Sequence, residues 1–133
     1  MKAFCCQMEV QFFLLDATKH FLSRMNEVRG GASVAHHPQL GLLVSGGWND
    51  SCPCDLSSTE LWTDGPTTFS AFTPLPIALS SHCVVALDRD DGEFFLAGGY
   101  SFDYNRRSFI HRGNWWDEVA PMPTERYGKK SKS

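Results

Sequence analysis

The sequence predicts an all-β protein in which a unit of about 50 residues occurs more than once. An apolar run ends in a glycine pair and an aromatic residue at Gly46-Gly47-Trp48, and again 52 residues later at Gly98-Gly99-Tyr100. A Leu75-Pro76 step recurs 47 residues later as Met122-Pro123. The segments between turn residues are short apolar runs or alternate with period two, which is typical of strands.

Length and charge narrow the class of protein. The chain has 133 residues, of which 42% are hydrophobic and 13% aromatic, so it can bury one core of ordinary size. Its net charge of −3 supplies no basic field, and we expect no nucleic-acid partner. No apolar run approaches the roughly 20 residues that span a bilayer, and polar residues at Gln7, Glu9 and Gln11 interrupt the opening stretch. We therefore expect neither a membrane partner nor a cleavable signal.

The five cysteines predict neither a disulfide framework nor a metal site. Their number is odd, and Cys5-Cys6 and Cys52-Pro53-Cys54 are spaced too closely for the members of each pair to bridge one another well. We expect reduced thiols. A zinc site would need well-spaced pairs and histidine partners that the sequence does not offer. Cys83 opens an alternating segment and is expected to be a small buried residue. No cofactor is predicted.

The N-terminal part is divided into an extension, residues 1–9, and half a unit, residues 10–28. Residues 18–25 taken alone are compatible with an amphipathic helix. The order of residues in the repeat favours two strands instead, the first of them around Phe12 to Leu15.

The first complete unit covers residues 29–76. A strand from Val34 turns at His36-His37-Pro38 into a second strand that ends at Ser45 and is apolar on both faces, as in a buried strand. The glycine pair after it is expected at positive φ or at a close backbone approach. A loop, a third strand, a turn and an outer strand follow, at 48–56, 58–63, 64–66 and 67–72 respectively.

The second complete unit covers residues 77–125 and repeats this order. Its expected strands are 83–87, 93–97, 107–111 and 115–119, with an acidic turn at 88–92, a loop at 101–106 and a turn at Gly113-Asn114. Because neighbouring strand residues face opposite sides, one of Trp115 and Trp116 is expected to be exposed. Residues 126–133 are interpreted as the start of a further unit and a basic tail.

These units resemble those of the kelch-repeat family over about residues 10–128. The resemblance implies four-stranded antiparallel blades of a β-propeller, about two and a half of them, so that this chain alone does not close the ring and is expected to belong to a longer protein. The residues that carry the motif are Gly46, Gly47, Gly98, Gly99, Trp62, Phe69 and Trp116.

The resemblance also implies a protein–protein interaction module that reads a partner through loops at one end. The candidate partner-binding residues are Trp48, Asn49, Asp50, Phe102, Asp103 and Tyr104. The identity of the protein partner stays open, and self-association through open blade edges is expected. A galactose-oxidase-like copper enzyme and a structural fragment without activity are the alternatives.

No enzyme activity is predicted. Ser80, Ser81 and His82 supply nucleophiles and a base, but the sequence assigns no third group to orient the base. His36 and His37 point to opposite faces of a strand and cannot share a metal. The carboxylates of 88–93 lack calcium-loop spacing, so a solvated turn is expected. The compartment stays open, with the cytoplasm slightly favoured; in a secreted parent the sequon that starts at Asn49 would matter.

Overall fold

Antiparallel strands make up all the regular structure that the computed structural model describes, which comprises residues 4–5, 13–15, 21–50, 52–63, 69–89 and 92–123. Within these ranges no helix occurs, and the prediction of an all-β protein is confirmed. The strands are β1 Phe4–Cys5, β2 Phe13–Leu15, β3 Phe21–Arg24, β4 Ser33–His37, β5 Gly41–Ser45, β6 Trp48–Asn49, β7 Cys52–Asp55, β8 Thr59–Trp62, β9 Ser70–Ala71, β10 Cys83–Arg89, β11 Gly92–Ala97, β12 Tyr100–Ser101, β13 Asp103–Tyr104, β14 Ser108–Arg112 and β15 Trp115–Val119.

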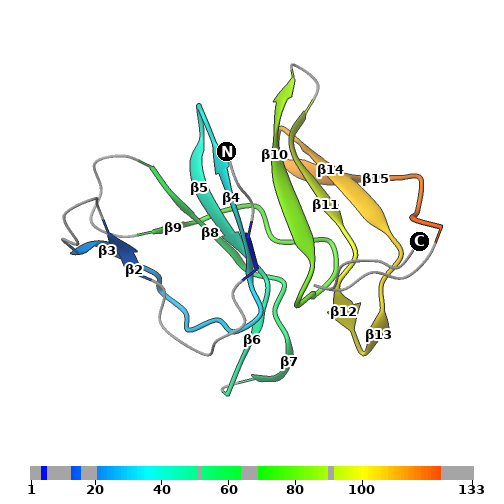
Figure 1. The fold of residues 1–133 in the computed structure, drawn as a ribbon, viewed down its shortest axis with the longest axis horizontal. Helices are drawn as coiled ribbons and strands as arrows, with labels where there is room; N and C mark the ends of the chain where they lie inside the picture. Colours follow the sequence, from blue (N-terminus) through cyan, green and yellow to red (C-terminus); the bar gives the residue numbers. More distant parts are fainter. Residues whose placement is uncertain are drawn as a thin grey trace.

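Two large sheets lie side by side (Figure 1). The first sheet has the order β1-β4-β5-β8-β9 and the second sheet has the order β10-β11-β14-β15. In the described part of the chain neither sheet closes into a barrel. Strands β2 and β3 pair with each other beyond the first sheet, as expected for residues 10–28, whereas the pairing of β1 with β4 was not predicted.

The two sheets share one hydrogen-bonding frame. In the first unit Trp48 N donates a hydrogen bond to Gly30 O at 2.8 Å. In the second unit Tyr100 N donates to Ser80 O at the same distance; Tyr100 lies 52 residues after Trp48, and Ser80 lies 50 residues after Gly30. The hydrogen bonds that follow each glycine pair also recur: Leu56 N to Gly47 O matches Asn105 N to Gly99 O, and Leu75 N to Ser57 O matches Met122 N to Arg106 O. The repeat seen in the sequence is therefore a repeat of backbone geometry.

The glycine pairs sit where the chain leaves β5 and β11. Their φ angles are 62° and 93° at Gly46 and Gly47, and 74° and 92° at Gly98 and Gly99, which confirms the predicted positive φ. A Cβ on Gly47 would lie 2.5 Å from Gly30 O and 3.1 Å from Ala32 N. Since both of these atoms belong to the backbone, they cannot move aside as a side chain can.

Replacing Gly47 with alanine is expected to lower the free energy of unfolding by at least about 2 kcal/mol, because the substitution adds a steric overlap to the strain of a positive φ. Gly113 is the matched control: its φ is 63°, and a Cβ added there would meet nothing within 4 Å. Gly113→Ala should cost only the strain, about 1 kcal/mol. Equal losses in urea titrations of the two variants would contradict the close-approach argument.

The core lies between the sheets and extends to the far side of the first one. Ala35 and Leu43 of the first sheet pack with Val84, Phe94 and Leu96 of the second. On the other face of the first sheet, the buried side chains are Met25, Ala32, Val34, Val44 and Phe69. Strand β5 is thus buried on both faces, as predicted for an apolar run.

Backbone hydrogen bonds join the two sheets at the end where the glycine pairs lie. Gly47 N donates to Leu79 O at 2.8 Å, and Ser81 N donates to Gly31 O at the same distance. Val84 N, at the start of the second sheet, donates to Ser33 Oγ at 3.0 Å. These contacts fix the ends of the two sheets relative to each other.

The units differ at one buried pair. Arg29, which precedes the Gly30–Trp48 bridge, contacts Glu60 of β8 with Nη2 and Oε2 3.1 Å apart. Leu79 precedes the equivalent Ser80–Tyr100 bridge and packs in the same cluster as Phe109 of β14. One unit therefore holds an ion pair where the other holds two apolar side chains.

Two predictions about cysteines are wrong. Cys83 is exposed, because the first sheet covers the face of β10 that carries Val84, and Cys83 lies on the opposite face. Cys54 is disulfide-bonded, so it is not a reduced thiol. The expected turn at 64–66, the start of the outer strand at 67–68, the central residues 90–91 of the acidic turn and the segment 126–133 lie outside the described residues.

Candidate functional site

Two short hairpins project from the same end of the two sheets (Figure 1). One is formed by β6 and β7 after the first glycine pair, and the other by β12 and β13 after the second. Both segments were predicted as loops from their composition; the prediction of their position holds, but each contains a two-stranded ladder. Because the sheets are joined at this end, the hairpins face each other, and β12 contacts β7.

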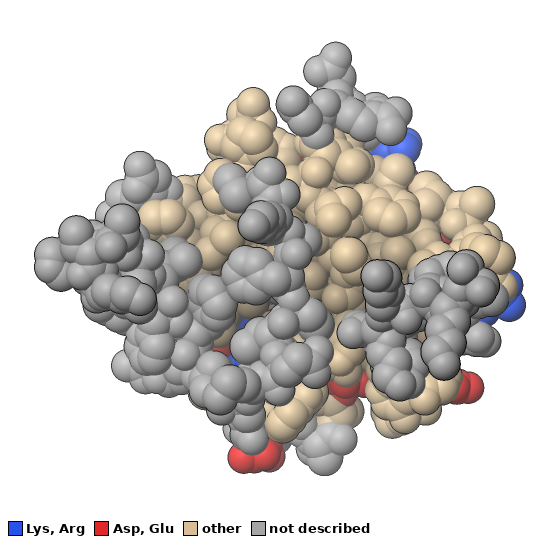
Figure 2. Space-filling view, in the orientation of Figure 1, with Lys and Arg blue, Asp and Glu red and all other residues tan. Residues whose placement is uncertain are grey.

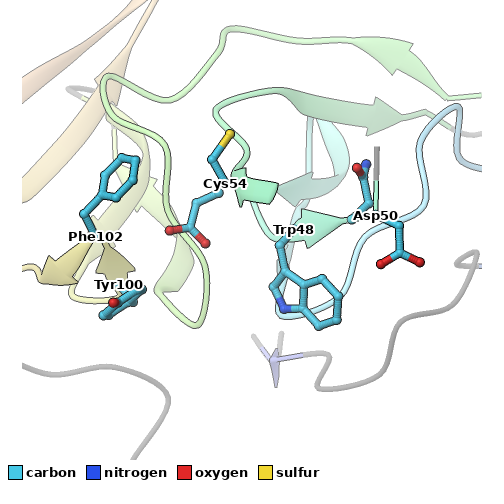
Figure 3. Close-up of a pocket in the computed structure, with 7 residues that line it drawn as sticks. Trp48, Asp50, Cys54, Tyr100 and Phe102 are labelled. Carbon is cyan, nitrogen blue, oxygen red and sulfur yellow. The ribbon is translucent and has the colours of Figure 1, made fainter. Parts of the chain in front are cut away.

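A cavity of about 500 Å³ opens between the hairpins (Figure 3). Trp48 and Asp50 lie on one side of it and Tyr100 and Phe102 on the other, with Cys54 between them. The described residues that line it are Trp48, Asn49, Asp50, Cys54, Asp55, Tyr100 and Phe102. The structure therefore brings together four of the six predicted partner-binding residues, Trp48, Asn49, Asp50 and Phe102.

The other two predicted residues, Asp103 and Tyr104, are exposed on β13 and do not line this cavity. They support the hairpin that does. The Tyr104 ring packs edge-on against Tyr100 with centroids 5.7 Å apart, and Asp103 Oδ1 accepts a hydrogen bond from Tyr104 N at 2.7 Å.

Aromatic side chains are unusually exposed around the cavity. The exposed fraction is 37% for Trp48, 40% for Tyr100 and 85% for Phe102. Rings of this size bind partners strongly when they are desolvated, because each buries a large apolar area with little loss of side-chain entropy.

Phe102 is strained as well as exposed. It sits at the tip of the second hairpin between the paired residues Ser101 and Asp103, with φ at 60°. A side chain with a Cβ disfavours this left-handed conformation, and such strain is retained where the surrounding structure enforces it, often at binding sites. Here the strained residue presents its ring to solvent instead of to the core.

The cavity carries negative charge. Asp50 is exposed and Asp55 half-buried, and none of the seven lining residues is basic. Among the side chains that the structure describes, no Lys or Arg pairs with either carboxylate. Figure 2 shows Asp and Glu atoms along the lower edge, where the hairpins lie in Figure 1, and Lys and Arg atoms mainly near the upper and right-hand edges.

Two asparagines fix the hairpins to the sheets. Asn49 is half-buried and its Nδ2 donates to Val28 O at 3.0 Å, so the side chain of the sequon asparagine is anchored to the segment before β4. Asn105 is buried; its Nδ2 donates to Gly98 O at 2.7 Å and its Oδ1 accepts from Arg107 N at 3.0 Å. The role of Asn105 was not predicted, although the repeat aligns it with Leu56, whose N donates to Gly47 O at the end of the first hairpin.

Comparison with protein-family models and with curated proteins finds no match to this chain. The described residues include no group of three or more His, Cys, Asp or Glu side chains placed to hold a metal ion. They also include no helix long and apolar enough to cross a membrane.

His82 does not face the serines next to it in the sequence. Its Nε2 lies 2.8 Å from Ser45 Oγ, and no described residue contacts its Nδ1 by a hydrogen bond. Complete burial lowers the pKa of His82 to about 3. The ring is therefore neutral at pH 7. His82 lies between the two glycine turns, with its ring next to Gly46 and its Cβ next to Gly99.

A second histidine forms a partly buried array that was not predicted from the sequence. His111 lies 3.1 Å from Glu93 Oε2 through Nδ1 and 3.1 Å from Thr73 Oγ1 through Nε2. Burial lowers the pKa of His111, against the effect of the Glu93 carboxylate. Glu93, which was expected in a solvated turn, therefore ties strand β11 to β14, and Thr73 joins both to the segment that follows β9.

The remaining motif residues pack inside or between the sheets. Phe69 is buried, and Trp62 is half-buried against the same cluster. Trp116 is half-buried beside His111, with ring centroids 5.0 Å apart, whereas Trp115 is 57% exposed, so the predicted division of this pair is confirmed. His36 and His37 face opposite sides, as predicted, and His37 Nδ1 accepts hydrogen bonds from Gln39 N and Leu40 N.

Proposed function

We propose that this chain is a protein-interaction module of the kelch type, which binds a partner protein through the two hairpins at one end of its sheets. The observation that carries the proposal is the cavity between equivalent hairpins, lined by exposed aromatic rings and by carboxylates that no described basic side chain neutralises. Its volume lies in the range of about 300–1,000 Å³ that ligand sites occupy.

The repeated frame supports the kelch interpretation. Four neighbouring strands correspond in the two sheets: β4, β5, β8 and β9 in the first, and β10, β11, β14 and β15 in the second. In both, a glycine pair follows the second strand, and a hydrogen-bonded hairpin lies between the second and third strands. In a propeller made of such blades, equivalent loops emerge on the same end of the ring. Partner recognition would then depend on loops that differ in sequence while the blades that hold them stay alike.

Further blades would cover the outer face of the second sheet. Val85, Phe95 and Ile110 are neighbours in register on β10, β11 and β14, and all three are half-buried. They face away from the first sheet, because the adjacent row of Val84, Leu96 and Phe109 packs toward it. We propose that another blade, from the same protein or from a second copy, packs on this row.

The binding proposal can be tested by quantitative partner capture on the immobilised full chain. Trp48→Ala combined with Phe102→Ala should reduce the captured amount of each specific partner by about tenfold or more, as expected for aromatic hot spots. At Phe102, alanine leaves the backbone strain unchanged, so that substitution removes only the ring. Thermal unfolding of each variant checks that the fold is retained.

Trp115→Ala is the matched control. Trp115 is also exposed, but it follows the Gly113-Asn114 turn at the end of the second sheet opposite to Ser108 and the hairpins. Capture by this variant should equal that of the unmodified chain. If the hairpin variant retains its partners while Trp115→Ala loses them, the binding surface lies at the other end and the proposal is wrong.

A further inference from the structure

We propose that the cavity between the hairpins binds an arginine side chain of the partner protein. This inference rests on the proposed function and specifies what the site recognises. It follows from three features that occur together: the cavity, its aromatic rings and its carboxylates.

The charge of the cavity selects a cation. Asp50 and Asp55 both line it, and the described residues place no basic side chain against either one. An anionic group entering here would meet two like charges and, among the lining residues that the structure describes, no cation. A basic side chain would instead gain a charge-assisted hydrogen bond to a carboxylate.

The aromatic rings favour the same kind of ligand. A cation is attracted to the face of an aromatic ring, most strongly to tryptophan, when it lies within about 6 Å of the ring centre. Trp48 lies on one side of the cavity and Tyr100 on the other (Figure 3). A charged group that enters between the hairpins therefore has an aromatic ring on each side of it.

Arginine fits this combination better than lysine. Its planar guanidinium can stack on a ring while its donors pair with a carboxylate in the same plane, whereas the lysine ammonium is a compact, strongly hydrated point charge. The cavity, about 500 Å³, is larger than a single side chain and leaves room for the adjoining peptide. Phe102, held at the hairpin tip at 85% exposure, can close over the aliphatic part of such a ligand.

Peptide titration followed by NMR on the isotopically labelled full chain tests the proposal. The probes are the amidated, acetylated peptide Gly-Ser-Arg-Ser-Gly and the same peptide with citrulline in place of arginine, which keeps the shape and removes the charge. We expect the arginine peptide to shift the signals of the two hairpins, and the citrulline peptide to bind about tenfold more weakly. The equivalent lysine peptide should also bind more weakly than the arginine peptide.

Substitutions in the chain provide the second arm. Asp50→Asn combined with Asp55→Asn should weaken arginine-peptide binding by about tenfold and remove the preference over citrulline. Asp117→Asn is the control for the loss of one carboxylate charge outside the hairpins; Asp117 lies on β15, where it pairs with Arg112 at 3.7 Å. It should leave the affinity unchanged. A loss of the same size in this control would show a general charge effect and overturn the proposal.

The outcomes separate this inference from the function on which it rests. If arginine and citrulline peptides bind equally well and Phe102→Ala weakens both, the hairpins bind peptides but the arginine assignment is wrong. If no peptide binds while partner capture still depends on Trp48 and Phe102, the arginine assignment is again wrong and the binding function stands. If the peptides bind but neither peptide binding nor partner capture changes in any hairpin variant, both proposals are wrong.

Discussion

Replacing Arg29 with leucine is expected to destabilise the protein by about 3–5 kcal/mol, because the substitution leaves a buried carboxylate without its counter-charge. Arg29 is 1% exposed, and its Nε and Nη2 lie 3.2 and 3.1 Å from Glu60 Oε2. Its Nη1 also donates to Gly46 O at 2.8 Å and to Ser58 O at 2.9 Å. The side chain thus satisfies backbone carbonyls beside the first glycine pair as well as the charge on Glu60. Urea unfolding of the variant measures the loss.

A double variant separates the unpaired charge from the lost packing. Arg29→Leu combined with Glu60→Gln removes both charges, while the glutamine oxygen can still accept the hydrogen bond that Glu60 Oε1 takes from Asn26 N at 2.7 Å. We expect it to be more stable than Arg29→Leu alone, because replacing both members of a buried ion pair costs less than removing one. The second unit already tolerates an apolar pair, Leu79 and Phe109, at these positions.

Arg107 provides the surface control for this prediction. Its Nε and Nη2 lie 2.8 and 3.0 Å from the two oxygens of Glu118, a geometry at least as good as that of the buried pair. Both side chains are exposed, so solvent screens their attraction. Arg107→Leu should therefore cost a small fraction of what Arg29→Leu costs. Equal costs would show that burial does not set the strength of the Arg29 pair.

The backbone of the repeat could be predicted from the sequence because local rules determine it. Positive φ favours glycine, so two glycine pairs after apolar runs predict two equivalent turns, and the structure confirms them. Strands β4, β5, β8, β11, β14 and β15 lie within a residue or two of the expected ranges for the same reason. Their alternation or continuous apolar character is a property of neighbouring residues.

Long-range pairing could not be predicted in this way. Arg29 and Glu60 are 31 residues apart, and the array of Thr73, Glu93 and His111 joins three separate segments. The sequence around each of these residues does not predict which distant residue it pairs with. The alternating pattern of β10 predicts two apolar faces but does not indicate which face packs on the first sheet. Cys83 was therefore predicted to be buried, although it lies on the exposed face.

The candidate site was predictable in place but not in detail. The repeat puts the segments after the two glycine pairs at one end, which is how Trp48 and Phe102 were selected. Asp55 lies within the predicted loop 48–56 but was not singled out, because its position on the cavity depends on the pairing of β6 with β7. Tyr100 was missed because its position depends on the Ser80–Tyr100 bridge. The ladders are only two to four residues long and include Asn, Pro and Asp, a composition that predicts a loop.

Acid should destabilise the fold through His82. The pKa of this histidine is about 3 in the folded protein, lowered by burial, against 6.5 for an exposed ring. Above about pH 7.5 the ring is almost entirely neutral in both states and its titration contributes no pH dependence. Between about pH 6 and pH 3 the unfolded chain binds a proton that the folded chain does not, so the free energy of unfolding should fall by about 1.4 kcal/mol for each unit that the pH falls. The lowered pKa of His111 adds to the loss with the same sign.

Two variants isolate this contribution in urea titrations carried out from pH 8 to pH 4. His82→Gln should be less stable than the unmodified chain at pH 8, because packing is lost. Below pH 6 its free energy of unfolding should fall less steeply, with a slope smaller than that of the unmodified chain by about 1.4 kcal/mol per pH unit. Ser45→Ala removes the hydroxyl group 2.8 Å from His82 Nε2 and keeps the titrating ring. It should lower the stability at pH 8 and retain the full slope. If the curve of His82→Gln runs parallel to that of the unmodified chain at every pH, His82 is not the group that couples protonation to unfolding, and the buried neutral ring between the glycine turns makes no contribution to acid sensitivity.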